Sequence, residues 1–298
     1  LVATVPVVAE RLAFGRGGLL AVEIVANRFN AVRPPGAGGS APEIVDPANG
    51  RSWSPAYSPD GTLAVVSDRS GGAGVWLSRP GTPARLLTGL GNGSGDDLSW
   101  SPDGASLAFS AARDGKVGTS VVGPAGEERA RIPVAGVYAG RPAWSADARS
   151  LTFPVRDGGG WRLWRADLAR PARPWPITGY GWAAVGARGD TLYAMRSDRP
   201  GLWRLDTTPR RVAAGFSGRS PDRWTLYGNE VVFGGDGGTG RRRLLSVALS
   251  GGVARPFADL PGASRHLDFA IDPRSGKPTY IAVLSADTDI ELFHLSRR

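Results

Sequence analysis

The sequence predicts an all-β fold: a seven-bladed β-propeller of four-stranded antiparallel blades, with six or eight blades as alternatives. The first observation behind this prediction is a hairpin motif that recurs with periods of 43 and 44 residues. The second is that short apolar runs, separated by glycine and proline, fill most of the remaining chain. No apolar stripe of helical period interrupts them.

Each copy of the motif consists of an aromatic residue, the turn Ser-Pro-Asp-Gly and a second apolar strand. Copies lie at 57–65, 100–109 and 144–153, the third with alanine in place of the proline and the glycine. Proline fixes φ in such a turn, and the Asp-Gly pair supplies side-chain hydrogen bonds and a positive φ. The turn aspartates Asp60, Asp103 and Asp147 set the period, which favours one repeated unit over three unrelated hairpins.

Weaker copies around Trp182, Trp224 and Phe269, and an earlier one at 12–22, bring the number of units to seven. The predicted blades span 9–46, 47–89, 90–132, 133–178, 179–214, 215–258 and 259–298, within a single domain at 1–298. Third strands are predicted at 75–77, 161–164, 202–205, 244–247 and 290–293, and fourth strands at 85–89, 176–179 and 210–213. The last unit stops after its third strand, so we expect strand 2–8 to complete it and to close the ring.

Composition narrows the class of protein. The 298 residues include no cysteine, which excludes disulfides, cysteine-ligated zinc and thiol catalysis. The formal net charge is +9, but the arginines are scattered, apart from short clusters at 210–211, 241–243 and 297–298. Because nucleic-acid grooves need clustered basic residues interleaved with aromatics, we predict no direct nucleic-acid binding. A dispersed basic surface could attract acidic partners or a membrane surface.

The beginning of the chain predicts a missing upstream segment. The sequence starts at Leu1, and its only methionine is Met195. No apolar run reaches the roughly 18 residues that a membrane-spanning helix needs. We therefore expect any membrane tether to lie upstream of Leu1.

The repeat motif, with Leu-Thr-Gly closing a blade at 87–89, resembles the WD-type repeats of the TolB family. The resemblance covers about 50–215 well and the remainder loosely. It implies a propeller, and TolB itself would imply a periplasmic scaffold bound to a peptidoglycan-associated lipoprotein. The helical N-terminal domain of TolB has no counterpart here. The sialidase Asp-box matches less well, because it separates Asp from Gly by one residue.

Segments 201–206, 250–256 and 287–295 resemble the propeller of CadC-type transcription regulators. Those proteins join a cytoplasmic winged-helix DNA-binding domain, through one membrane helix, to a periplasmic propeller. The resemblance implies that this chain is the periplasmic sensor domain of such a regulator.

Residues suited to catalysis are few. His266 and His294 are the only histidines, which excludes a multi-histidine metal centre, and no Gly-x-Ser-x-Gly motif occurs. We interpret His294 as structural and His266 as a surface residue. A Ser-His-Asp triad, which only geometry defines, stays open. We predict no cofactor and no enzymatic activity.

A weak metal candidate lies near the C-terminus. Asp287, Asp289 and Glu291 alternate along a predicted strand, so one face of that strand could present three carboxylates to calcium. The sequence lacks the spacing of an EF-hand loop, which favours a solvated strand entrance instead.

The predicted binding site is one mouth of the central channel, which borders the segments that lead into the innermost strands. Those segments contribute Arg51, Asp96, Asp97, Arg141, Tyr180, Trp182, Arg219, Asp222, Arg223, Arg265 and His266. Charged and aromatic groups that converge on one concavity are typical of a binding site, although they could also form inter-blade ion pairs. We expect a protein partner or a small anionic ligand, held by arginine forks.

Three functions follow. The leading hypothesis is a non-enzymatic sensor or interaction propeller of a membrane-bound regulator. The alternatives are a free TolB-like periplasmic scaffold and a propeller hydrolase or lyase that uses the mouth residues.

Overall fold

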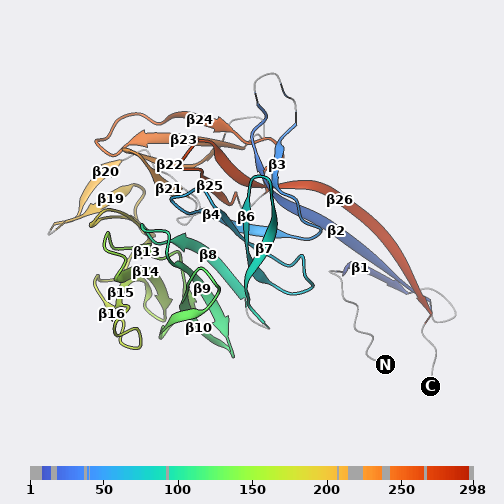
Figure 1. Ribbon diagram of the computed structural model, residues 1–298, viewed down its shortest axis with the longest axis horizontal. Helices are drawn as coiled ribbons and strands as arrows, with labels where there is room; N and C mark the ends of the chain where they lie inside the picture. The colour runs from blue at the N-terminus through green and yellow to red at the C-terminus, as the bar shows by residue number, and fades with distance from the viewer. Residues whose placement is uncertain are drawn as a thin grey trace.

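The structure is a computed structural model that describes residues 9–14, 19–36, 39, 41–91, 94–206, 208–213, 224–236, 242–264 and 267–294. For 285–294 and most of 9–27 the description covers the backbone alone. Within these residues the chain forms six antiparallel sheets, the blades of a β-propeller. Figure 1 shows the innermost strands β4, β8, β13, β21 and β25 gathered around the middle of the molecule.

Blades 1 to 5 follow one another along the chain, and each runs outward from its innermost strand. Blade 1 consists of β4 (Ser52–Tyr57), β5 (Leu63–Ser67), β6 (Gly74–Arg79) and β7 (Thr82–Gly89). Blade 2 consists of β8 (Ser94–Trp100), β9 (Leu107–Arg113), β10 (Lys116–Val122) and β11 (Glu128–Pro133). In blade 3 the innermost strand is split into β12 (Tyr138–Ala139) and β13 (Ala143–Trp144), followed by β14 (Ser150–Asp157), β15 (Gly160–Asp167) and β16 (Trp175–Pro176).

The next two blades have the same order of strands. Blade 4 consists of β17 (Trp182–Arg188), β18 (Thr191–Arg196), β19 (Leu202–Leu205) and β20 (Arg210–Ala213). Blade 5 consists of β21 (Trp224–Tyr227), β22 (Glu230–Asp236), β23 (Arg242–Ala248) and β24 (Arg255–Asp259). The predicted third and fourth strands of blades 1 to 5 fall within these elements, except that the strand predicted at 176–179 overlaps β16 only at Pro176.

Blade 6 combines the two ends of the chain. Its order is β25 (Phe269–Ile271), β26 (Pro278–His294), β2 (Leu19–Arg33) and β3 (Glu43–Asp46), and β1 (Ala9–Phe14) pairs with the other end of β2. The prediction of seven blades is therefore wrong for the described chain, and the alternative of six is confirmed. Segment 9–46 has no innermost strand of its own, so it cannot form a separate blade and instead supplies the two outer strands of the last one.

The closure of the ring also differs in detail from the prediction. The strand predicted at 2–8 lies outside the described residues. The strand predicted at 290–293 is not a third strand, because β26 continues without a turn and pairs with β2 from Val32–Tyr280 to Leu19–His294. No glycine or proline follows Pro278 to interrupt it.

The repeated turns form as the motif predicts. Gly61 and Gly104 have φ of 79° and 69°, and Ala148, which replaces glycine in the third copy, is held at 57°. In the second copy, Ser101 Oγ donates to Asp103 Oδ1 at 2.5 Å, and the same aspartate accepts the N–H of residue 105. The serine and aspartate side chains thus form hydrogen bonds within the turn and stabilise it.

The aromatic residue of each copy links its blade to the preceding one. Trp144 Nε1 donates to the carbonyl of Ser99 at 3.0 Å, and Trp100 Nε1 donates to the carbonyl of Ala56 at 3.3 Å. Tyr57, at the corresponding position of blade 1, shares a 2.7 Å hydrogen bond with Thr279 of blade 6. The repeat in the sequence therefore encodes a repeated inter-blade contact.

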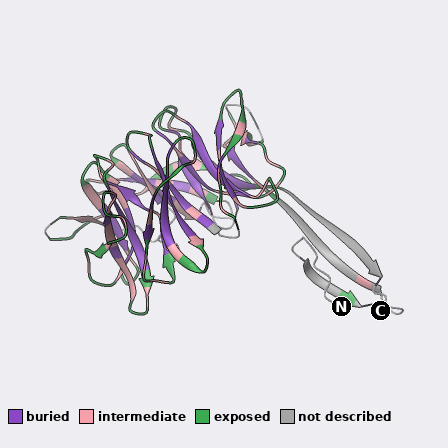
Figure 2. Ribbon diagram, turned by 60° about the horizontal axis from the view of Figure 1, so that its bottom comes forward, coloured by how far each residue is buried: buried purple, intermediate pink, exposed green. Residues whose placement is uncertain are grey.

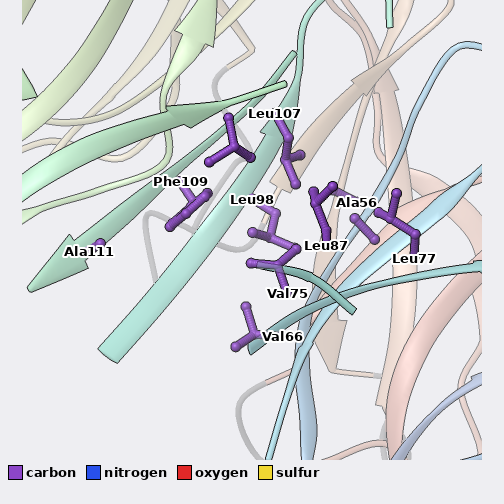
Figure 3. Close-up of a cluster of buried hydrophobic side chains, with 11 residues drawn as sticks. Ala56, Val66, Val75, Leu77, Leu87, Leu98, Leu107, Phe109 and Ala111 are labelled. Atoms are coloured by element: carbon purple, nitrogen blue, oxygen red, sulfur yellow. The ribbon is translucent and has the colours of Figure 1, made fainter. Parts of the chain in front are cut away.

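The hydrophobic core lies between neighbouring blades. Figure 2 shows buried residues running along the strands and exposed residues at the turns. Between blades 1 and 2 the cluster contains Val66, Val75, Leu98, Leu107 and Phe109, which Figure 3 shows pointing toward one another. Such apolar burial is the main favourable term for a fold of this kind.

Two ion pairs fix the N-terminal strands in the ring. The Asp46 side chain of β3 is fully buried and pairs with Arg69 of blade 1. Arg33 of β2 donates to Asp272 of blade 6 at 2.9 Å and to the Tyr57 hydroxyl at 3.2 Å. The described residues contain no helix long and apolar enough to cross a membrane.

Candidate functional site

The centre of the propeller contains a cavity of about 1080 Å³, to which all six blades contribute. It extends from Tyr138 and Arg141, at the beginning of an innermost strand, to the turns that contain Pro59 and Pro102. Its aromatic lining residues are Tyr57, Trp100, Tyr138, Trp144, Trp161, Trp224, Tyr227 and Phe269. The cavity therefore follows the length of the innermost strands.

The charged side chains among the described lining residues are two arginines, Arg141 and Arg156. No described aspartate, glutamate or histidine lines the cavity. A mostly apolar cavity with a small number of like charges favours ligands of the opposite charge. The site therefore suits an anionic group on an otherwise apolar ligand.

Four corresponding positions surround one mouth of the channel. Ser54, Asp97, Arg141 and Asp268 each lie four residues before the residue that opens the following turn. In blades 1 and 2 this position falls in a β-bulge, with φ of 51° at Ser54 and 59° at Asp97. A β-bulge turns a side chain away from the regular alternation of the strand, so the residue at this position can face the mouth of the channel.

Arg141 is the member of this set that lines the cavity. Its Nε lies 4.0 Å from Asp97 Oδ1, and its Nη1 donates to the carbonyl of Trp224 in blade 5 at 3.5 Å. The buried Nε makes no hydrogen bond within the described part of the chain. The guanidinium is therefore held in place by long contacts that leave donor capacity for a ligand.

Asp97 supports Arg141 from the neighbouring blade. Its side chain is 5% exposed, and Oδ2 accepts the Tyr138 hydroxyl at 2.8 Å. On the other side of the ring, Asp268 Oδ2 accepts the N–H of Ser54 at 3.3 Å, and Ser54 Oγ accepts the N–H of Leu98 at 3.2 Å. These contacts join blades 6, 1, 2 and 3 at the mouth.

Two predicted mouth residues form local contacts instead of lining the cavity. Arg51 is exposed and pairs with Asp68 of its own blade at 2.8 Å. Asp96 Oδ1 accepts the N–H of Asp97 at 2.8 Å, so its carboxylate fixes the bulge.

Tyr180 and Trp182 also lie off the cavity. Tyr180 is 48% exposed, and the guanidinium carbon of Arg162 lies 5.0 Å from the centre of its ring. Trp182 is buried between blades, where it packs edge-on against Trp203 with the Arg196 guanidinium on its ring. The remaining predicted mouth residues, Arg219, Asp222, Arg223, Arg265 and His266, lie outside the described residues.

The weak metal candidate lies in β26. Asp287, Asp289 and Glu291 pair with Ala26, Ile24 and Val22 of β2, and only their backbone is described. Among the side chains that the structure describes, no three His, Asp or Glu groups converge as metal ligands would.

Sequence reasoning missed part of the site. Tyr138, Arg156 and Trp161 occupy paired positions on three neighbouring strands, Tyr138 opposite Arg156 and Arg156 opposite Trp161. All three line the cavity. The glycine-rich turn at 158–160 could have predicted this arrangement. It joins β14 to β15 at the mouth, so the residues just before and just after the turn lie near the mouth.

The comparisons with known proteins concern the fold. TolB from Acinetobacter baumannii matches 89% of this chain over 66% of its own length, with 17% identity and a TM-score of 0.58. A putative TolB from Agrobacterium tumefaciens matches 87% of this chain and 99% of its own, with 18% identity and a TM-score of 0.63. An oligogalacturonate lyase in complex with manganese matches 85% and 77%, with 19% identity and a TM-score of 0.54.

The chain has a TolB-like β-propeller fold. No protein-family model matches it, and no curated protein matches it in sequence. The similar solved structures include TolB proteins and a lyase, so the fold alone does not identify a function.

Proposed function

We propose that this TolB-like propeller is a non-enzymatic binding module whose central channel receives an anionic ligand or a protein loop. The observation that carries the proposal is the pairing of an aromatic cavity of about 1080 Å³ with Arg141 and Arg156, the charged residues among its described lining. Arginine forks bind carboxylates and phosphates through charge-assisted hydrogen bonds, which are strongest where water is excluded.

The wider proposal is a sensor domain. The resemblance of 201–206, 250–256 and 287–295 to CadC-type regulators supports a periplasmic propeller joined to a cytoplasmic DNA-binding domain through an upstream membrane segment. A free periplasmic scaffold like TolB is the second candidate, favoured by the likeness to the TolB structures. The codons before Leu1 distinguish the two: a winged helix followed by one apolar span supports the sensor, and a cleavable signal supports the scaffold.

Ligand binding by the channel is tested with a panel of small carboxylates, phosphates and neutral sugars. We expect at least one anion, and no neutral sugar of similar size, to raise the thermal unfolding midpoint of the protein. Titration calorimetry of Arg141→Gln should then show an affinity about tenfold lower, the loss of roughly 1.4 kcal/mol of binding free energy.

The matched control is Arg170→Gln, an exposed arginine beyond the other end of β15. It should bind the same anion as the unaltered protein does. The proposal fails if no anion of the panel binds, or if Arg141→Gln and Arg170→Gln bind equally well.

A further inference from the structure

Blade 3 carries an unusual share of the exposed apolar surface. Half of the large hydrophobic residues that are exposed within the described chain belong to it. They are Val137, Tyr138, Trp175, Ile177 and Tyr180, with Val137 74% exposed. Isolated exposed apolar residues are ordinary, but a concentration of them on one side of a disc indicates an interaction surface.

Four aromatic or apolar residues gather at the mouth end of this blade. Tyr138 and Trp161 pack edge to face with ring centres 5.6 Å apart. The Tyr180 ring lies against Gly159, where an added Cβ would come within 2.3 Å of the ring carbon Cζ. We define Val137, Tyr138, Trp161 and Tyr180 as the blade 3 platform.

The platform is continuous with the channel. Val137, Tyr138 and Trp161 line the central cavity, as does Arg156, which lies between the last two across the strands. A partner that rests on the platform can therefore insert a side chain into the cavity without leaving the surface.

The platform is also cationic. Arg141, Arg156 and Arg162 lie at this end of the blade, where Asp157 is the acidic residue among the described side chains of the blade. Asp157 is already engaged, since it pairs with Arg162 at 3.0 Å and accepts the N–H of Gly159 at 2.9 Å. That N–H bond is the largest cause of the lowered pKa of Asp157. Arg156 is exposed and forms no ion pair within the described chain.

From these contacts we infer that the blade 3 platform docks an acidic protein segment with an apolar anchor, which enters the channel beside Arg141 and Arg156. This inference rests on the proposed function and names its partner class. The aromatic side chains provide contact area at low conformational cost, and the two arginines select a carboxylate next to the anchor.

A protein segment fits better than a nucleic acid. Nucleic-acid binding needs a row of cations that follows the phosphates and aromatic faces open to stacking. Here Arg141 and Arg156 are the cations at the cavity, and Trp161 presents its ring to Tyr138 at 79° rather than as an open face.

The test is a selection of short random peptides displayed on phage against the folded protein. We expect the enriched peptides to carry Asp or Glu within a few residues of Trp, Phe or Leu. Synthesised with a fluorescent label, they should bind in anisotropy titrations and weaken as salt rises. Arg156→Gln, Tyr180→Ala and Val137→Ser should each weaken binding by about tenfold.

Matched variants separate the platform from a general loss. Arg170→Gln lies at the opposite end of the same blade, and Val253→Ser alters a residue of blade 5 that is 92% exposed. Both should bind the peptides as the unaltered protein does. All five positions are exposed, so the variants should fold, and their thermal midpoints verify this.

Several outcomes would contradict the proposal that the platform docks an acidic segment. They are enrichment of neutral or basic peptides, no enrichment, equal binding by platform and control variants, or platform-dependent binding of an oligo(dT) probe that is tighter than that of any selected peptide. If small anions still bind through Arg141 while acidic peptides do not, the proposed function stands and the platform alone is rejected. If neither binds, both are rejected.

Discussion

The guanidinium of Arg141 reaches the carbonyl oxygen of Trp224 at 3.5 Å, which joins blade 3 directly to blade 5 through the interior of the ring. Blade 4 lies between these blades in the sequence and contributes nothing to this contact. A single side chain therefore bridges two blades that are not neighbours, at the mouth of the channel. Replacing it changes both the electrostatics and the free width of the mouth.

The Tyr138 hydroxyl should stabilise the folded protein through Asp97, whose carboxylate it orients toward Arg141. Tyr138→Phe removes a 2.8 Å hydrogen bond to a carboxylate that is nearly buried. We expect a loss of about 1–2 kcal/mol in the free energy of unfolding, measured by urea titration. Tyr180→Phe removes a hydrogen bond to the Asp157 carboxylate from a residue that is 48% exposed, and it should cost less than about 1 kcal/mol. Equal losses would contradict the role of Tyr138.

The buried ion pair of β3 should be one of the most sensitive points of the ring. Arg69→Ala leaves the fully buried Asp46 carboxylate without its partner, so we expect a loss of about 3–5 kcal/mol in unfolding free energy. The control is Arg113→Ala, which breaks an exposed pair with Glu128 and should cost less than about 1 kcal/mol. Chemical denaturation of the two variants side by side measures the difference. A small effect at Arg69 would show that β3 does not hold the ring closed.

The third turn should gain stability from glycine. Ala148 has φ of 57°, a conformation that costs an L-residue about 1–2 kcal/mol and glycine almost nothing. Ala148→Gly should raise the unfolding free energy by about 0.5–1 kcal/mol after the entropy of glycine is subtracted. The reverse change, Gly104→Ala, should lower the unfolding free energy by a similar amount, because Gly104 has φ of 69°. An added Cβ would meet only Pro59 at an ordinary 3.5 Å, so a steric clash adds nothing to this loss. Changes of the same sign in both turns would contradict this account.

The turns should also make stability depend on pH. Hydrogen bonds from Ser58, Thr62 and the Thr62 N–H lower the pKa of Asp60 from 3.8 to about 2. The pKa values of Asp103 and Asp147 are lowered as well, first by their serine hydrogen bonds. A depressed folded pKa adds stability above the unfolded value, which is lost as pH falls through the folded one.

We therefore expect the urea concentration at the unfolding midpoint to decrease as the pH is lowered from about 4 to about 2, in part because these turn aspartates become protonated. Asp60→Asn should make that decline shallower. Glu43→Gln, which alters an exposed carboxylate outside these turns, should leave the decline unchanged. Identical pH profiles for the unaltered protein and Asp60→Asn would contradict the assignment.

Much of the fold could be predicted because one contact repeats. The aromatic residue before each turn donates to the preceding blade, so the period of the motif is the period of the ring. The number of blades could not be derived in the same way. The sequences of β2 and β3 resemble those of the other strands. They belong to blade 6 only because β2 pairs with β26 and β3 pairs with β2.

The site was harder to predict than the fold. The spacing of the repeats placed Asp97 and Arg141 at the mouth, since both precede a turn by the same distance. It could not indicate that Arg51 would pair with Asp68, or that Trp182 would be buried between blades. Such outcomes depend on which neighbouring side chain is within reach, and this is set by packing rather than by spacing.

The composition of blade 6 has a consequence for how the chain must fold. Ribosomes release β2 and β3 before blades 1 to 5 and β26 after them, so these two strands wait for the synthesis of five blades before their main partner exists. Contacts between the two ends carry the highest loop-closure entropy in the molecule, which predicts a slow final docking step. Until then blades 1 to 5 form an open arc in which the apolar outer faces of blades 1 and 5 lack their packing partner, and association with another molecule competes with closure.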